Sequence, residues 1–449
     1  MTIVLILLSA LAAFFAVVLI RTARFRPKAE PDASLPPLAE APDAALAAEH
    51  LAEMIRIRTV SFADKAQEDP EPFEEFPRLL ARLYPNVHSA CKCERPGPRS
   101  LLFRWPGKTP GDPTVLMAHY DVVPADEDAW EKPPFAGIIE GGVLWGRGTL
   151  DTKGTLLGVM EAAEAMIARG FVPEHDIYLA FAGDEEIAGT GAPTTVKLLK
   201  ARGIHAALVV DEGGAVVENV FPGVSRPCAL VGIGEKGSVN FEFSLASKGG
   251  HASAPPAHTL VGHSTFVYRM IFANLWCFLP LLDLICKKRG GELNALMRTT
   301  CAFTMMEGSR AANVLPPKAR MVANLRLISG DTASSAAEAL RAVIQDDSIA
   351  VQRLNGDDPS PFSRTDSEGW RRLRRAIRAT WPEALVSPYL MIAGSDSRHF
   401  SAISENVMRF CPMALSTEER GYIHGHNERI PVEKLGTLVE FYLRLIAQC

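Results

Sequence analysis

The chain opens with an uninterrupted apolar stretch. Residues 2–20 carry no charge, and their length matches the roughly 20 residues with which a helix crosses a bilayer core. Four basic residues follow between positions 21 and 28, while none precedes the stretch as in a cleaved signal peptide. We therefore expect residues 1–20 to form a single-pass membrane anchor. The positive-inside rule favours a cytoplasmic globule, but four charges leave the side of the membrane open.

The following residues are rich in proline and polar side chains. Four prolines fall within residues 29–44, a composition typical of a stiff, solvated spacer, and we assign a linker to residues 21–44. An amphipathic pattern from residue 45 to about residue 56 predicts the first helix of the globular part.

Beyond this helix, apolar strands alternate with helices. The predicted elements are, in order, a strand at 114–119, a helix at 156–169, strands at 176–182 and 206–210, and a closing helix at 432–447. Such a βαβ rhythm is typical of an α/β fold with a mostly parallel sheet and helices on both faces. We expect this main domain to comprise residues 45–236 and 356–449.

A different pattern interrupts this rhythm. Residues 237–246 alternate apolar and polar positions like a half-exposed antiparallel strand, and residues 318–327 also have strand character. A helix is predicted at 334–344. We assign residues 237–355 to an inserted α+β domain.

The inserted domain contains a long apolar run at residues 266–286. Arg269, Pro280 and Asp283 interrupt it, which argues against a second membrane span. A buried helix is the default interpretation. The alternative is an apolar rim that meets a fatty-acyl chain or the bilayer surface.

Composition narrows the class of protein. With 47% hydrophobic and 22% charged residues among 449, the chain can bury a large core, which excludes a disordered protein. The 47 basic and 52 acidic residues give a net charge of −5, so no overall basic field exists to hold nucleic acid. The 8 cysteines are too sparse for a disulfide-stapled scaffold.

Histidine and carboxylate side chains gather where the predicted strands end. His119 and Asp121 close the first strand on one face, so that Asp121 can orient the His119 imidazole. Asp151 follows a glycine-containing turn and opens a helix. Taken alone, each of these is more often strand-end polarity or a helix N-cap than a metal site.

Further acids and a histidine repeat this placement. Glu185 and Glu186 follow the strand at 176–182, Asp211 ends the next buried strand, and His424 precedes the closing helix. Carboxylates crowded at one sheet edge repel one another unless a cation relieves them. Together these sites predict a divalent metal centre. Imidazole and carboxylate ligands favour zinc, with cobalt and manganese as alternatives.

The order of these motifs resembles the co-catalytic di-zinc aminoacylase and carboxypeptidase family over essentially all of residues 45–449. Within it, several short phrases resemble the branch that contains carboxypeptidase S and the N-fatty-acyl-amino-acid synthase/hydrolase. These phrases lie at residues 59–62, 293–300, 312–317 and 394–399.

The resemblance implies a role for each position. His119, Asp151 and Asp211 would hold one zinc, and Asp151, Glu186 and His424 would hold the other, giving two Zn²⁺ per chain. Glu185 would be the general base, because a carboxylate beside the ions can take the proton of a metal-activated water. Asp121 completes the implied catalytic set.

The same resemblance makes the inserted domain a lid, which in many relatives is also a homodimer surface. His251 would stabilise the developing oxyanion, while Asn313 and Arg326 would bind the substrate carbonyl and free carboxylate. Gly394 and Ser395 would line the carboxylate end of the pocket. The other interpretation of Arg326 is a surface charge on a strand.

The activity implied is cleavage, or formation in reverse, of an amide bond next to a free C-terminal carboxylate in short peptides or N-acyl amino acids. A deacetylase or esterase acting on another small molecule stays open. So does a binding domain that has lost catalysis, although all the implied ligand positions and Glu185 are present.

Overall fold

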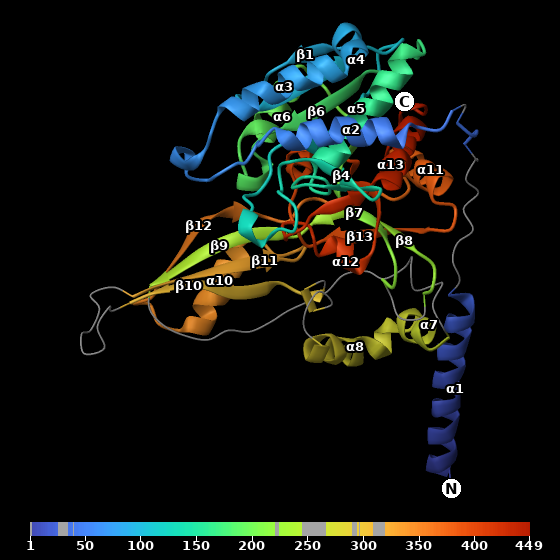
Figure 1. The fold of residues 1–449 in the computed structure, drawn as a ribbon. Helices are drawn as coiled ribbons and strands as arrows, with labels where there is room; N and C mark the ends of the chain where they lie inside the picture. Colours follow the sequence, from blue (N-terminus) through green and yellow to red (C-terminus); the bar gives the residue numbers. More distant parts are fainter. Residues whose placement is uncertain are drawn as a thin grey trace.

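The computed structural model describes residues 2–25, 35–38, 40–220, 224–244, 266–289, 294–295, 297–308 and 319–449. Figure 1 shows a layered body of sheet and helices, a smaller sheet beside it, and a long helix that projects away from both. This is an α/β fold with an additional α+β unit, as the sequence predicted.

The main sheet contains eight strands in the described part of the chain, in the order β1-β2-β6-β3-β7-β14-β8-β13. Four neighbouring strand pairs are parallel and three are antiparallel. The sheet is therefore mixed, with slightly more parallel than antiparallel pairs. The strand bounds are Lys92–Glu94 (β1), Ser100–Trp105 (β2), Thr114–His119 (β3), Ile177–Ala182 (β6), Leu208–Val217 (β7), Cys228–Glu235 (β8), Leu385–Met391 (β13) and Val407–Leu415 (β14).

Both faces of this sheet are buried, which explains the unbroken apolar runs in the sequence. On β3, Leu116 and Ala118 point into the larger core, whereas Val115 and Met117 point into a smaller core on the opposite face. Helices close the two cores. The larger core includes α2 (Ala44–Arg56), α3 (Glu71–Leu83), α5 (Lys153–Ala168), α11 (Glu368–Thr380) and α13 (Val432–Ile446), and the smaller includes α6 (Gly191–Ala201) and the 3-10 helix Asp396–Ala402.

The smaller sheet is antiparallel, in the order β10-β11-β9-β12. One face of this sheet packs against helix α10 (Ala333–Ile344). Val239, Phe241 and Phe243 on β9 (Gly237–Ser244) share a core there with Ala333 and Ala337 of the helix. We call these elements the small-sheet unit: β9 (Gly237–Ser244), β10 (Thr300–Glu307), β11 (Arg320–Leu327), α10 (Ala333–Ile344) and β12 (Ala350–Asp357). Both strands and the helix predicted here are present, while the limits of the inserted domain at 237 and 355 stay predictions.

A third, short antiparallel sheet joins two loops that are far apart in sequence. It consists of β4 (Ile138–Glu140), β5 (Val143–Trp145) and β15 (Arg429–Pro431). Gly146 donates its backbone N–H to the carbonyl of Glu428 at 2.9 Å, which brings the loop before α5 beside the loop after α12 (Thr417–Arg420). The remaining short helices are α4 (Pro85–Ala90) and the 3-10 helices Lys65–Gln67, Glu127–Ala129 and Glu185–Ile187.

The projecting helix is α1 (Thr2–Arg24). By length and composition it could cross a membrane, with a mean hydropathy of 3.2. Its side chains are mostly exposed, except near its end, where Val18 and Thr22 are buried beside α7 (Phe266–Ala273). The following helix, α8 (Leu275–Arg289), is bent from α7 by 111°.

Candidate metal centre

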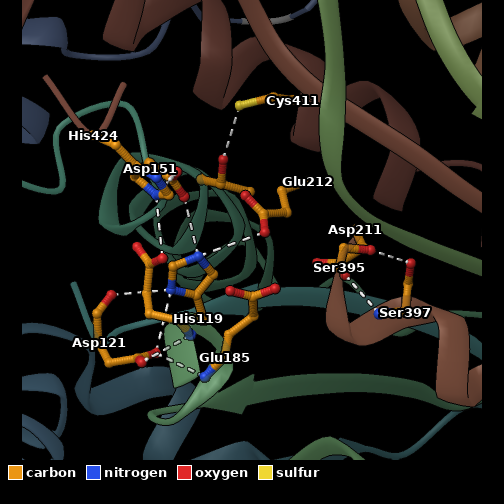
Figure 2. Close-up of polar contacts among 12 residues, drawn as sticks. His119, Asp121, Asp151, Glu185, Asp211, Glu212, Ser395, Ser397, Cys411 and His424 are labelled. Carbon is orange, nitrogen blue, oxygen red and sulfur yellow. Dashed lines mark hydrogen bonds and ion pairs between the residues drawn. The ribbon is translucent and has the colours of Figure 1, made fainter. Parts of the chain in front are cut away.

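Loops at one edge of the main sheet bring together side chains from distant parts of the chain (Figure 2). Because β3, β6 and β7 are parallel neighbours, their carboxyl ends share this edge. The residues concerned are His119 at the end of β3, Asp151 before α5, Glu185 and Glu186 after β6, Glu212 in β7 and His424 after α12.

Two groups of donor atoms, each within 4.8 Å of one another, form here and share one residue. In the first, His119 Nε2 lies 3.1 Å from Asp151 Oδ1 and 3.5 Å from Glu212 Oε1. In the second, His424 Nε2 lies 3.0 Å from Asp151 Oδ2 and 3.1 Å from Glu186 Oε2. Asp151 therefore turns one carboxylate oxygen toward each group, the arrangement of a bridging ligand between two cations.

Asp121 organises the first group from behind. The His119 Nδ1 atom lies 3.0 Å from the backbone carbonyl of Asp121 and 3.3 Å from its Oδ1, which leaves Nε2 facing the cluster. The same carboxylate accepts the backbone N–H of Glu185 and of Glu186, both at 3.2 Å. Ser61 donates a further hydrogen bond to Asp121 at 2.7 Å. One buried acid thus fixes three neighbouring positions of the site.

Glu428 holds the loop that carries Asp151. Its buried carboxylate accepts backbone N–H groups of Gly148 at 3.0 Å and Leu150 at 2.7 Å, and it pairs with Arg147 at 2.7 Å. These contacts satisfy the charge of Glu428 within the protein and fix the path of the backbone into Asp151.

At one predicted ligand position the structure brings a neighbouring acid into the first group. The third member of that group is Glu212, while the assignment of Asp211 as a ligand stays a prediction. Successive side chains of a strand point to opposite sides, so only one of the two acids can face the cluster. Asp211 instead turns toward the 3-10 helix that starts at residue 396, where it accepts the backbone N–H of Ser397 at 3.0 Å (Figure 2).

Burial acts differently on the acids of this edge. It tends to raise the pKa of Asp151, but hydrogen bonds from His119 and His424 outweigh it and lower that pKa. Burial, reinforced by the charge of Asp151, raises the pKa of Glu212 to about 8. Burial likewise raises the pKa of Glu185 well above its usual range, and Glu212 adds to this shift. Figure 2 shows the Glu185 carboxylate directed toward Glu212 and His119. Glu185 is in neither donor group, and its role as general base stays a prediction.

The donor set fits a pair of divalent cations. Oε1 of Glu186 is buried without a hydrogen-bond partner, as is Oδ2 of Asp396 nearby. Carboxylates outnumber the two imidazoles, and each group offers nitrogen and oxygen donors of the kind that zinc prefers. A buried carboxylate oxygen without a partner is costly, so this edge of the sheet favours positive charge beyond that which His119 and His424 supply among the described residues.

The residues predicted to bind substrate lie in different surroundings. Ser395 turns its hydroxyl to Glu235 at 2.8 Å, and Gly394 is the exposed residue before it. Arg326 on β11 is half-buried and donates to Asn324 at 3.2 Å, while burial and then neighbouring Arg398 lower its pKa. His251 and Asn313 lie outside the described residues.

Sequence reasoning missed two groups that shape this edge. Glu235 at the end of β8 ion-pairs with Arg409 on β14, and both are fully buried. Asp396, between Ser395 and Ser397, is also buried, and burial together with Asp211 raises its pKa well above the usual range. The alternation of side chains along a strand is a sequence signal that could have pointed to Glu212 as an alternative to Asp211. No local sequence signal links Glu235 to Arg409.

Comparison with known proteins agrees with this geometry. The model of peptidase family M20/M25/M40 matches residues 115–448. A probable carboxypeptidase S-like protein of Dictyostelium discoideum is 33% identical, covering 89% of this chain and 84% of the relative. An N-fatty-acyl-amino acid synthase/hydrolase of Xenopus tropicalis is 35% identical, over 89% of this chain and 85% of the relative.

A solved structure shares the fold at low sequence identity. The M20 family metallo-carboxypeptidase Sso-CP2 of Sulfolobus solfataricus superimposes with a TM-score of 0.65 at 15% identity, covering 89% of this chain and 98% of its own. The chain therefore belongs to peptidase family M20/M25/M40. It is an enzyme of the metallo-carboxypeptidase and aminoacylase type, which confirms the family and the reaction class expected from its motifs.

Proposed function

We propose that this protein is a membrane-anchored, di-zinc hydrolase that cleaves the amide bond next to a free carboxylate in short peptides or N-acyl amino acids. The observation that carries the proposal is the Asp151 carboxylate, shared between two donor groups with Glu185 beside them. The relatives named for carboxypeptidase S and for N-fatty-acyl-amino acid synthesis and hydrolysis support this substrate class, and formation of the same bond in reverse.

Two divalent cations held by these groups would lower the pKa of a shared water and polarise the scissile carbonyl. Glu185 would take the proton from that water on its carboxylate and return it to the leaving amine. Asp121 keeps Glu185 in place through the backbone hydrogen bond described above.

The substrate's free carboxylate requires a cationic partner. We assign this role to Arg326, whose guanidinium is half-buried and pairs with no acid among the described residues. Burial, and then the neighbouring charge of Arg398, lowers its pKa. Gly394 and Ser395 would line the same end of the pocket, and His251 would stabilise the oxyanion. For the anchor we propose α1, whose hydropathy and exposure fit a single membrane span. A homodimer through the inserted domain stays a prediction.

The test separates metal binding from chemistry. We expect Glu185→Gln to retain two metal ions per chain, measured by elemental analysis of the purified protein. Turnover of a panel of dipeptides, N-acetyl and long-chain N-acyl amino acids should fall by about 1,000-fold, the scale of a lost general base.

The matched control is Glu71→Gln, which removes an exposed carboxylate on α3 and should leave turnover unchanged. Full activity of Glu185→Gln, or a metal-free wild-type protein that ignores chelators, would refute the proposed mechanism.

A further inference from the structure

Helices α7 and α8 present their apolar side chains to the outside. Five large apolar residues of α8 are more than two-fifths exposed: Trp276, Leu279, Leu281, Leu284 and Ile285. Within this apolar stretch the one charged residue, Asp283, pairs with the buried Arg298 just before β10, and the basic residues Lys287, Lys288 and Arg289 follow only in the last turn of the helix. A helix whose exposed surface is apolar up to its last turn differs from a water-facing helix, whose exposed surface is polar.

The corner between these helices is fastened to α1 by polar contacts. Asn274 is fully buried and donates its side-chain amide to the carbonyl of Val18 at 3.2 Å and to Thr22 Oγ1 at 3.3 Å. Arg21 donates to the backbone carbonyl of Ala273 at 3.0 Å. The last turns of α1 are therefore attached to the α7–α8 corner through several matched donors and acceptors.

A ring contact fixes the depth of α8 along α1. Trp276 packs edge-on against Phe14, with ring centroids 5.5 Å apart. Phe14 precedes Arg24 by ten positions, which corresponds to about 15 Å along a helix axis. That is half of the roughly 30 Å hydrocarbon core of a bilayer. Figure 1 shows α8 running across the direction of α1 rather than along it.

We propose that α7 and α8 are embedded in the same bilayer leaflet that α1 enters, with the exposed face of α8 against lipid acyl chains. This inference rests on the proposed anchor and goes beyond it, because it places part of the inserted segment inside the membrane. A lipid partner is favoured over a second copy or a free acyl chain, because the same helices that carry the apolar face already contact the candidate span. The 111° bend rules out a straight second span.

In this arrangement the small-sheet unit would be held at the membrane surface, since Arg298 ties α8 to the start of β10. An acylated substrate dissolved in the leaflet could then reach the enzyme by lateral movement along the membrane, without crossing water as a free molecule.

Tryptophan fluorescence offers a direct test. The chain has 6 tryptophans, none of them in α1, and five of them lie in the main domain. The full-length protein is reconstituted in phosphatidylcholine vesicles that carry bromine at a shallow or a deep acyl position. We expect quenching of the wild-type protein to be lost in Trp276→Phe and retained in Trp145→Phe.

A double variant, Leu279→Glu with Leu284→Glu, should also lose the quenching, because buried carboxylates in lipid are costly. It should hydrolyse a soluble dipeptide as the wild type does, yet lose turnover of a long-chain acyl amino acid presented in vesicles.

Flotation after an alkaline carbonate wash separates the two proposals. A protein that fails to float with vesicles refutes the anchor. A protein that floats while its emission is unaffected by brominated lipid refutes the embedding of α8. If the protein forms dimers that Leu284→Glu dissociates, and brominated lipid does not quench its emission, the exposed face of α8 binds a second copy of the chain. That result would overturn the lipid proposal.

Discussion

The buried carboxylates around Glu235 and those around Asp151, both at the main sheet, differ in how their negative charge is compensated. Around Glu235 the protein supplies every partner, since Arg409 pairs with the carboxylate and Ser395 donates both its hydroxyl and its backbone N–H. Around Asp151 the acids face one another, and within the described part of the chain only the two imidazoles of His119 and His424 oppose them.

The contrast teaches how to recognise a cation site. The number of acids does not decide the matter, because Glu428 lies beside Asp151 and is fully provided with donors. What marks the metal cluster is a set of carboxylates that the fold leaves short of positive partners, including the unpartnered Glu186 Oε1. The Glu235 cluster should therefore act as a structural lock, and the Asp151 cluster as a site completed by metal.

The sharpest test of this contrast is Asp151→Asn. Because Asp151 serves both donor groups, we expect loss of both metal ions and a fall in turnover of about 10,000-fold, as for an essential catalytic unit. The metal-free variant should also be somewhat less stable in urea than the metal-free wild type, because Asp151 pairs with both His119 and His424. Retention of both metal ions by Asp151→Asn would contradict the proposed shared ligand.

The same change at the other cluster should have the reverse outcome. Glu235→Gln leaves the buried Arg409 charge without its counter-ion and should lower the unfolding free energy by about 3 kcal/mol, with or without metal. Urea denaturation measures this directly. The double variant with Arg409→Met should recover part of the lost unfolding free energy. If Glu235→Gln alone were as stable as the wild type, the Glu235–Arg409 pair would not stabilise the fold as proposed.

The metal-free protein should also respond to pH through Glu212. Its folded pKa of about 8 lies above the unfolded value near 4.5, so the folded state binds the extra proton between these limits. Its stabilising contribution is complete below about pH 4.5 and is lost as the pH rises toward 8, with a slope of at most about 1.4 kcal/mol per pH unit.

Urea denaturation of the apoprotein at several pH values checks this slope. Glu212→Gln should reduce this slope by its own share, while Glu185 and Asp396, whose pKa values are also raised, keep theirs. The assignment of a raised pKa to Glu212 would be wrong if the stability of the wild-type apoprotein rose across this pH window while that of Glu212→Gln fell.

The smallest effect is expected from Ser61→Ala. This change removes one hydrogen bond to Asp121, which itself orients His119 and the backbone of Glu185. Support of this kind is worth about 10-fold in metal affinity or activity. Competition with a chelator and steady-state kinetics would measure it, with Ser348→Ala on the exposed surface as the control.

Local patterns predicted the elements that carry the site. The strand at 114–119 and the helices near 45–56 and 432–447 are present within a residue or two, because apolar periodicity reports burial directly. The parallel majority of the sheet followed from the same rhythm. The antiparallel edge formed by β1, β2 and β6 did not, and neither did the place of β14, which inserts between β7 and β8 from nearly 200 residues away.

The sequence motifs predicted which residues come together at the site, but not which of two adjacent acids faces the donor group. His119, Asp151, Glu186 and His424 come together as the motif order implied. Between Asp211 and Glu212, the sequence offers two adjacent acids, and the direction that each faces depends on the path of β7 in three dimensions. The partnership of Glu235 with Arg409 likewise needed the folded chain, because 174 positions separate them.

The attachment of α1 has a mechanical consequence. Its side contacts lie on α7, while the next helix in the chain, α2, packs with α5 and α13 on the main sheet. If α1 is held in a bilayer, these contacts keep α7 and α8 close to the membrane. A relative movement of the two units would then displace the main sheet, with its two donor groups, rather than the small-sheet unit.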